Sequence, residues 1–266
     1  MFVNHKKEKY MIPKKIHYVW LGKNKPSPSV IRCIDSWRRV MPTYEIKCWN
    51  EDNFDIDSVT WVKEAIEKKK WSLASDYIRH YAVYNEGGIY FDTDVYTYKS
   101  LDDFLNYDFF SSIELHPNDF NNHGKHQLDK NCKPLIYGQG IAGLGILAAA
   151  FGACKGNVFI KECLDFFGSR HFIKEDGTLF EDFINPAIMA ELLIKYGFRY
   201  TDEKQELKDN MVVFPSSVLA GDIKTRTKDS HLIHWCDSTW RDPNFFNYKG
   251  KIILYLRTHF PSIFRR

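Results

Sequence analysis

Two acidic residues separated by a threonine, Asp92 and Asp94, directly follow the short apolar run 89–91. Two carboxylates at the end of an apolar strand can hold a hard divalent cation, because Mg²⁺ prefers oxygen ligands. Such an ion usually keeps several waters and binds through one or two carboxylates plus substrate phosphates. The pair therefore predicts a metal site that is completed by a phosphate-bearing ligand.

A second Asp-x-Asp, formed by Asp55 and Asp57, lies in a polar stretch with no apolar strand before it. We interpret that pair as a solvated turn, because the motif by itself is not specific. For Asp92 and Asp94 the alternative is a polar strand end or a helix-capping pair, and only their surroundings favour a metal.

The residues before Asp92 form one unit with it. Asp76 and Arg79 are three residues apart and share one face of a predicted helix. Gly87 is suited to the position just after such a helix, where the backbone often adopts the left-handed conformation. Tyr90 lies two residues before Asp92, so both side chains project to the same face of the strand that follows.

The string SDYIRHYAVYNEGGIYFDTDV, residues 75–95, resembles the DXD sugar-binding region of glycosyltransferase family 32. That grouping contains bacterial capsule and lipopolysaccharide transferases and yeast initiating mannosyltransferases, and clostridial glucosylating toxins have a similar region. The resemblance implies that Asp76 accepts hydrogen bonds from donor-sugar hydroxyls and that Arg79 contacts ribose, phosphate or base. Tyr90 would brace the nucleoside or the metal site. The alternative for Asp76 and Arg79 is a helix-surface ion pair, which contributes little.

The stretch 13–22, PKKIHYVWLG, is similar to the first strand of the same family. Its mostly apolar run ending in glycine predicts a buried strand. By the resemblance Val19 and Trp20 line the nucleoside pocket, where an aromatic ring can stack on a base. Core packing is the alternative for Trp20, and we expect His17 to be structural.

The stretch 230–240, SHLIHWCDSTW, resembles a third signature of that family, a histidine followed by Ser-x-Trp. His234 is the candidate third metal ligand, with His231 and Asp237 as alternatives. Ser238 and Trp240 are candidates to donate hydrogen bonds to the diphosphate.

Two further contacts are implied by the resemblance. Asn53, in the loop 50–57, is a candidate for nucleotide contact, and Gln139 is a candidate to approach donor sugar and acceptor. The glycines of 138–145 do not form a dinucleotide fingerprint, because no suitably placed acidic residue follows. We interpret the whole stretch 138–154 as a buried loop and helix.

Hydrophobic periodicity places the remaining elements. The polar stretch 115–133 is interpreted as a long loop, and its histidines 116, 123 and 126 are expected to be solvated. Ser29 is the expected N-cap of the first helix. Helices are predicted over 26–41, 58–69, 157–167 and 181–196, and strands over 44–49, 109–114 and 211–214. These elements predict an α/β fold, and the resemblance implies a GT-A-like (Rossmann-like) nucleotide-sugar-binding domain with helical elaborations, which we expect to span residues 1–266.

Composition fits a well-cored protein, with 44% hydrophobic and 16% aromatic residues. A net charge of +3 does not imply a nucleic-acid partner, and the six cysteines are scattered without metal spacing. Neither a signal peptide nor a run of about 18 apolar residues is found. We therefore expect a cytoplasmic protein that could contact the inner face of the membrane. The basic amphipathic segment 249–266 fits either a membrane-binding helix or a helix docked on the domain.

These features together predict a metal-dependent glycosyltransferase, using Mn²⁺ or Mg²⁺ and a nucleotide-sugar, with a UDP-sugar favoured. The acceptor would be a glycan or a lipid-linked acceptor in bacterial capsule or lipopolysaccharide synthesis. The resemblance implies retention of the anomeric configuration. The alternatives are a non-catalytic binder of nucleotide-sugar or divalent ions, and a sugar nucleotidyltransferase.

Overall fold

The protein is described by a computed structural model over residues 11–236. Its centre is a mixed β-sheet with the strand order β2-β1-β3-β7-β5-β9-β8, and β6 pairs with β5 beside this path. The strands of this sheet are β1 (Lys15–Val19), β2 (Glu45–Trp49), β3 (Gly88–Phe91), β5 (Phe109–Leu115), β6 (Leu144–Ile146), β7 (Ala150–Ala153), β8 (Gln205–Leu207) and β9 (Met211–Phe214).

Strands β2, β1, β3, β5 and β9 run in one direction, and β7 runs against them between β3 and β5. The carboxyl ends of β3 and β5 therefore lie at the same edge of the sheet. In open α/β sheets ligands bind outside this edge. A second, small sheet has the order β10-β11-β4, built from Leu219–Ala220, Leu232–His234 and Val95–Thr97.

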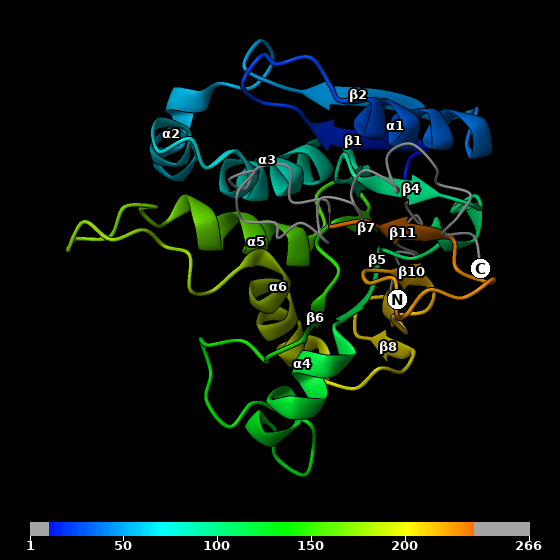
Figure 1. Ribbon diagram of the computed structural model, residues 1–266, viewed down its shortest axis with the longest axis vertical. Coiled ribbons are helices and arrows are strands. Elements are labelled where there is room, and N and C mark those ends of the chain that lie inside the picture. The colour runs from blue at the N-terminus through cyan, green and yellow to red at the C-terminus, as the bar shows by residue number, and fades with distance from the viewer. Residues whose placement is uncertain (1–10, 237–266) are drawn as a thin grey trace, which may run out of the picture.

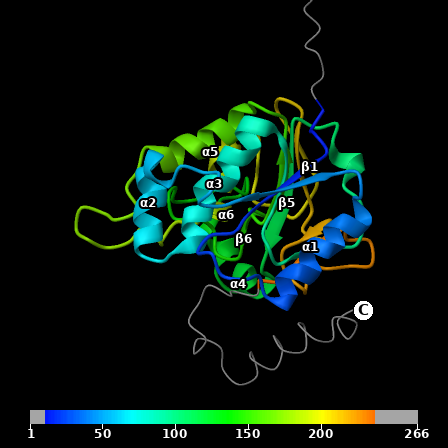
Figure 2. The same ribbon diagram turned by 90° about the horizontal axis from the view of Figure 1, so that it is seen from above.

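The helices are α1 (Pro28–Val40), α2 (Thr60–Glu67), α3 (Trp71–Glu86), α4 (Pro117–Asn122), α5 (Val158–Gly168) and α6 (Asn185–Leu193). They cover both faces of the large sheet (Figures 1 and 2). Alternating strand residues divide the core: Tyr90 and Phe109 pack in one hydrophobic cluster with α2, α3, α5 and α6. Phe91 and Phe110 pack in the other cluster with α1. This side-to-side alternation is what a strand imposes on its side chains.

The α/β prediction is confirmed, and most predicted elements lie where the periodicity put them. The N-cap of α1 was predicted wrongly: Ser27 accepts the hydrogen bond from the backbone N–H of Val30, and Pro28 follows it in the first turn. Proline is preorganised for that position, so the cap precedes it. The helix expected over 181–196 begins only at Asn185.

The stretch 138–154 is not a loop and helix, because it forms β6 and β7. Its small residues fit strands that neighbours approach closely: a Cβ on Gly152 would lie 2.4 Å from the Phe110 ring. The polar stretch 115–133 is likewise more regular than expected, since it contains α4 and a short 3₁₀ helix over 124–127.

Gly87 and Gly88 make the break between α3 and β3. Gly87 has φ +68° and ψ 176°, so it has the positive φ that was expected but an extended ψ rather than a left-handed helical one. That region is essentially restricted to glycine. A Cβ on Gly88 would lie 2.7 Å from the Lys15 carbonyl oxygen of the neighbouring strand β1.

The six cysteines, all between positions 33 and 236, are thiols that form no disulfide. Within residues 11–236 no helix has both the length and the apolar character needed to cross a bilayer.

Candidate functional site

A cavity of about 440 Å³ opens at the edge of the sheet where β3 and β5 end. Its walls come from α3, α6 and the ends of β3, β5 and β11, so distant parts of the chain converge there. The residues that line it combine charged, polar and apolar side chains. They are Lys70, Ser72, Leu73, Asp76, Arg79, Asp92, Glu114, Ala148, Ala149, Glu181, Ile184, Asn185, Pro186 and His234.

Asp92, Asp94 and His234 form a cluster in which each offers one ligand atom, and these atoms all lie within 4.8 Å of one another. The antiparallel pairing of β11 with β4 places His234 opposite Val95, next to Asp94. Nε2 of His234 lies 3.2 Å from Oδ1 of Asp94. Two carboxylates and one imidazole fit a borderline or hard divalent cation such as Mn²⁺ or Mg²⁺.

The alternative ligand His231 points elsewhere: its Nδ1 donates to the Ser100 carbonyl oxygen over 2.8 Å, and its ring packs on Phe104. Asp237, Ser238 and Trp240 lie outside the described residues. Burial by itself would lower the pKa of His234, but Cys236 and Asp94 raise it well above its usual value. The cluster thus favours a positive charge at this position.

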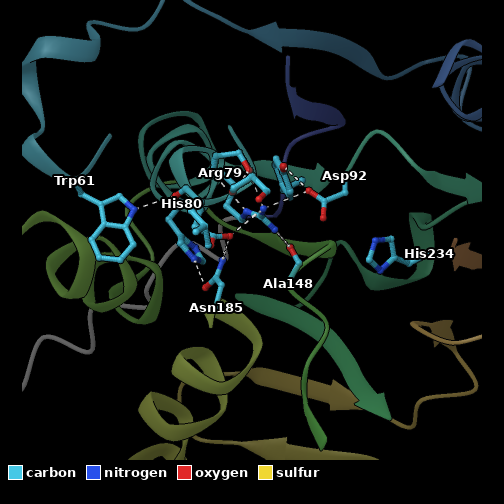
Figure 3. A network of polar contacts seen from close by, with 12 residues as sticks. Trp61, Arg79, His80, Asp92, Ala148, Asn185 and His234 are labelled. Atoms are coloured by element: carbon cyan, nitrogen blue, oxygen red, sulfur yellow. Dashed lines mark hydrogen bonds and ion pairs between the residues drawn. The ribbon is translucent and has the colours of Figure 1, made fainter. Parts of the chain in front are cut away.

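Arg79 links this cluster to the helix α3 (Figure 3). Its Nη2 lies 3.0 Å from Oδ1 of Asp76 and 3.4 Å from Oδ1 of Asp92. Its Nη1 donates to the Ala148 carbonyl oxygen over 2.8 Å, and the guanidinium lies over the Tyr90 ring. Asp76 is 7% exposed and Arg79 5%, so the pair is not a surface ion pair.

The charges of Asp76 and Arg79 in this buried site affect each other's pKa. Burial raises the pKa of Asp76 to about 6, although Arg79 and a hydrogen bond from Asn185 favour its charged form. Burial would lower the pKa of Arg79, but Asp92, Tyr90 and Asp76 outweigh it and raise that pKa. Arg79 is therefore a fixed positive charge beside the two carboxylates.

Tyr90 donates its hydroxyl hydrogen to Oδ1 of Asp92 over 2.7 Å, as the shared strand face allows. Burial raises the pKa of Tyr90 well above its usual value, so the phenol stays a donor. The Asp92 carboxylate is thus oriented from two sides, by Tyr90 and by Arg79.

Two residues of this site were missed as functional candidates, Asn185 and His80. Asn185 donates from Nδ2 to Oδ1 of Asp76 over 3.1 Å, and its Oδ1 lies 3.0 Å from Nε2 of His80 (Figure 3). Because an amide oxygen only accepts, Nε2 of His80 carries the hydrogen. Burial lowers the pKa of His80 to about 3, so the ring is neutral. His80 is four residues after Asp76, a helical spacing that offered a signal.

Four predicted residues neither line the cavity nor belong to the cluster formed by Arg79, Tyr90, Asp92, Asp94 and His234. Val19 is buried in the core at the end of β1, and Trp20 donates from its indole to the Asn24 carbonyl oxygen. Asn53 uses its amide within its own turn, donating to the Cys48 carbonyl oxygen. Gln139 is exposed on the loop before β6.

The remaining polar candidates are the second Asp-x-Asp and the histidines 116, 123 and 126. The second Asp-x-Asp is the expected surface turn, with Asp55 capping a short 3₁₀ helix and Asp57 paired with Lys63. His116 is not a solvated loop histidine, because it lies between two carboxylates. The other two histidines of this stretch, His123 and His126, are exposed as predicted.

Comparison with known proteins agrees with the motif. Residues 27–110 match the family described as the glycosyltransferase sugar-binding region containing the DXD motif, which confirms the prediction made from residues 75–95. The comparison with curated proteins returns no significant match.

Among solved structures the chain is similar to three glycosyltransferases. The PaToxG glycosyltransferase has 18% identity and a TM-score of 0.49, with 70% of each chain covered. A glycosyltransferase involved in glycosylation of the major capsid of PBCV-1 has 12% identity and a TM-score of 0.44, covering 83% of this chain and 93% of that one. The galactosyltransferase LgtC, solved with donor and acceptor sugar analogues, has 10% identity and a TM-score of 0.44, covering 84% and 87%.

Proposed function

The chain carries a glycosyltransferase sugar-binding region that contains the DXD motif, and from this we propose that it transfers a hexose from a nucleotide-sugar, with a UDP-sugar favoured, to a glycan or lipid-linked acceptor. The observation that carries the proposal is the placing of Asp92, Asp94 and His234 against the cavity that also holds Asp76 and Arg79. Metal ligands and sugar-binding groups thus share one site.

Asp92, Asp94 and His234 would hold the Mn²⁺ or Mg²⁺ ion. When bound, this ion supplies positive charge against a diphosphate leaving group. Arg79 adds a second positive charge, held in place by hydrogen bonds from the guanidinium to Ala148 and Ser75. Such preorganised charge stabilises the transition state without reorganising during the reaction.

Asp76 is placed to accept hydrogen bonds from hydroxyls of the donor sugar, with its carboxylate fixed by Arg79 and Asn185. Ser238 and Trp240, beyond the described residues, would donate to the diphosphate. Retention of configuration is part of the proposal. The acceptor oxygen bonds to the anomeric carbon on the face that the diphosphate leaves, and the departing phosphate oxygen takes the hydroxyl proton. A covalent sugar on a carboxylate side chain would contradict this route.

The biological setting belongs to the same proposal: synthesis of a bacterial surface polysaccharide, capsule or lipopolysaccharide, by a cytoplasmic enzyme. Contact with the inner face of the membrane would follow if the acceptor is lipid-linked. The basic segment 249–266 would serve that contact.

The test is release of free nucleotide from a panel of UDP- and GDP-sugars, with Mn²⁺ or Mg²⁺ and with chelator. Asp94→Ala is compared with Asp57→Ala, which changes the surface Asp-x-Asp. We expect metal-dependent release from one donor, lost in Asp94→Ala and kept in Asp57→Ala. Metal-dependent nucleotide binding without release would favour a binding protein, and release of pyrophosphate would favour a nucleotidyltransferase.

A further inference from the structure

A carboxylate that the reaction above does not use, that of Glu114, lines the same cavity. Glu114 stands near the end of β5, at the edge of the sheet where β3 presents Asp92. Its side chain is 13% exposed. A carboxylate this far from bulk solvent needs hydrogen-bond donors to stay charged.

His116 provides one such donor. Its Nε2 lies 3.4 Å from Oε1 of Glu114, and its Nδ1 lies 3.0 Å from Oδ2 of Asp222. The hydrogen bond that His116 donates to Glu114 contributes most to raising the pKa of His116 to about 9, so the ring is cationic at neutral pH. The Glu114 side chain therefore has a cationic partner, His116, that holds it in a fixed position.

The other carboxylates of the cavity already have strong partners. Asp76 and Asp92 contact Arg79, and Glu181 pairs with Lys70 over 2.7 Å. For Glu114, His116 is the ion-pair partner found within residues 11–236. Glu114 thus retains capacity to accept a hydrogen bond from a molecule in the cavity.

The chemistry of the two substrates decides which one meets Glu114. A carboxylate repels the diphosphate of the donor, and the donor-sugar hydroxyls are assigned to Asp76. An acceptor hydroxyl is a hydrogen-bond donor, and its bond to a charged acceptor is stronger than a neutral one. An anionic acceptor group would be repelled by a carboxylate at Glu114, which lines the cavity.

We propose that Glu114, positioned by His116, binds the acceptor by accepting a hydrogen bond from one of its hydroxyls, and that the acceptor is a neutral saccharide at this position. This rests on the proposed function. A purely structural role, in which His116 only ties β5 to the loop that carries Asp222, is the competing explanation.

The experiment separates the two substrates kinetically. Glu114→Gln keeps the side-chain shape and removes the charge. The matched control is Glu64→Gln, which changes another partly buried glutamate paired with a histidine, His171, but outside the cavity. Nucleotide release without acceptor reports donor use. Transfer to a panel of neutral saccharides (glucose, galactose, N-acetylglucosamine and their methyl glycosides) reports acceptor use.

We expect Glu114→Gln to raise the acceptor KM by about tenfold to a hundredfold, the equivalent of one hydrogen bond to a charged group. Its donor KM and acceptor-free release should stay within about threefold of the wild type. Glu64→Gln should leave the acceptor KM near the wild-type value. His116→Gln should raise the acceptor KM less than Glu114→Gln does.

Other results would overturn the inference. These are an unchanged acceptor KM in Glu114→Gln, an equal loss of acceptor-free release, an equal or larger effect on acceptor KM in Glu64→Gln, or a wild type that releases nucleotide but transfers to no saccharide of the panel. A wild type that releases no nucleotide from any donor would instead contradict the proposed function itself, and the inference with it.

Discussion

Asn185 donates a hydrogen bond to the carboxylate of Asp76 over 3.1 Å, although 109 positions separate them in the chain. The first turn of α6 thereby fixes a carboxylate on α3, in the wall of the cavity (Figure 3). His80 holds the opposite end of the amide, so the orientation of Asn185 is set as well. The Asp76 carboxylate is thus positioned by residues from two helices, Arg79 of α3 and Asn185 of α6.

Replacing Asn185 by alanine should leave two buried polar groups without this partner, on Asp76 and His80. We expect the free energy of unfolding to fall by about 1–3 kcal/mol, the usual cost of such groups. Urea denaturation measures it. The control is Asn121→Ala on the exposed surface of α4, which should change stability by less than about 0.5 kcal/mol. Equal stability of the two variants would show that the Asn185 contact contributes little.

The same substitution predicts a shift in pH dependence. Asp76 must be charged to accept hydroxyl hydrogens well, and its pKa is about 6. Donor turnover should therefore hold above about pH 6 and fall as the pH drops through that value. Asn185 favours the charged form. In Asn185→Ala the pKa of Asp76 should therefore be higher, and the acidic limb should move toward higher pH in a pH–rate profile. An unmoved limb would assign it to another group.

Local sequence patterns were enough to predict the elements that carry Asp76, Arg79 and Asp92, because these residues and the glycine break lie within one continuous segment. His234 could be proposed as a metal ligand only beside His231 and Asp237, and the β4–β11 register distinguishes the positions of the two histidines. Register is a long-range property that spacing in the sequence does not encode.

The parts that were predicted wrongly or missed depend on tertiary contacts. The strand β7 consists of Ala, Phe, Gly and Ala, without a pattern typical of a strand, and its conformation comes from pairing with β3 and β5. His116 and Asp222 are 106 positions apart, so no local signal could join them. The role of Asn185 was missed because its partner, Asp76, lies on another helix 109 positions away.

Arg79→Lys should keep the positive charge but lose the planar arrangement of donors that the guanidinium provides. A single ammonium cannot reach Asp76, Asp92 and the Ala148 carbonyl oxygen together, whereas the guanidinium contacts all three. We expect turnover to fall about a hundredfold, comparable to loss of one preorganised donor. Steady-state nucleotide release measures it.

The matched control for that variant is Arg38→Lys. Arg38 pairs with Asp35 at the same i, i+3 spacing, but both side chains are more than half exposed. Turnover should be unchanged in Arg38→Lys. Wild-type turnover in Arg79→Lys would show that charge alone is needed at this position.

Glu86 predicts how stability depends on pH at the end of α3. Its carboxylate accepts from Lys15 over 2.8 Å and from Lys47 over 2.6 Å, which ties the helix to β1 and β2. Burial would raise the pKa of Glu86, but these two lysines lower it to about 2 from a usual value of 4.5. Its stabilising contribution is therefore complete above about pH 4.5 and is lost as the pH falls toward 2.

Glu86→Gln should lower the free energy of unfolding at neutral pH by about 1 kcal/mol, since partly exposed ion pairs contribute modestly. Its stability should also fall less steeply than that of the wild type below pH 4.5. Urea denaturation across that range measures both, with exposed Glu175→Gln as the control. Parallel pH profiles for the wild type and Glu86→Gln would assign the acid sensitivity to other carboxylates.

Gly87 controls the direction in which the chain leaves α3 for the strand that ends at Asp92. Gly87→Ala should destabilise the protein by about 3 kcal/mol or more, because its backbone conformation is strained for any other residue and space is lacking. A Cβ there would lie 2.8 Å from both the Lys155 backbone nitrogen and Cδ of Pro13. Gly177→Ala separates these causes, since Gly177 also has positive φ, at +80°, but an added Cβ would have nothing within 4 Å. The control should lose only about 1–2 kcal/mol, the cost of the left-handed backbone. Urea denaturation of both variants is the measurement, and equal losses would show that the crowding at Gly87 relaxes without cost.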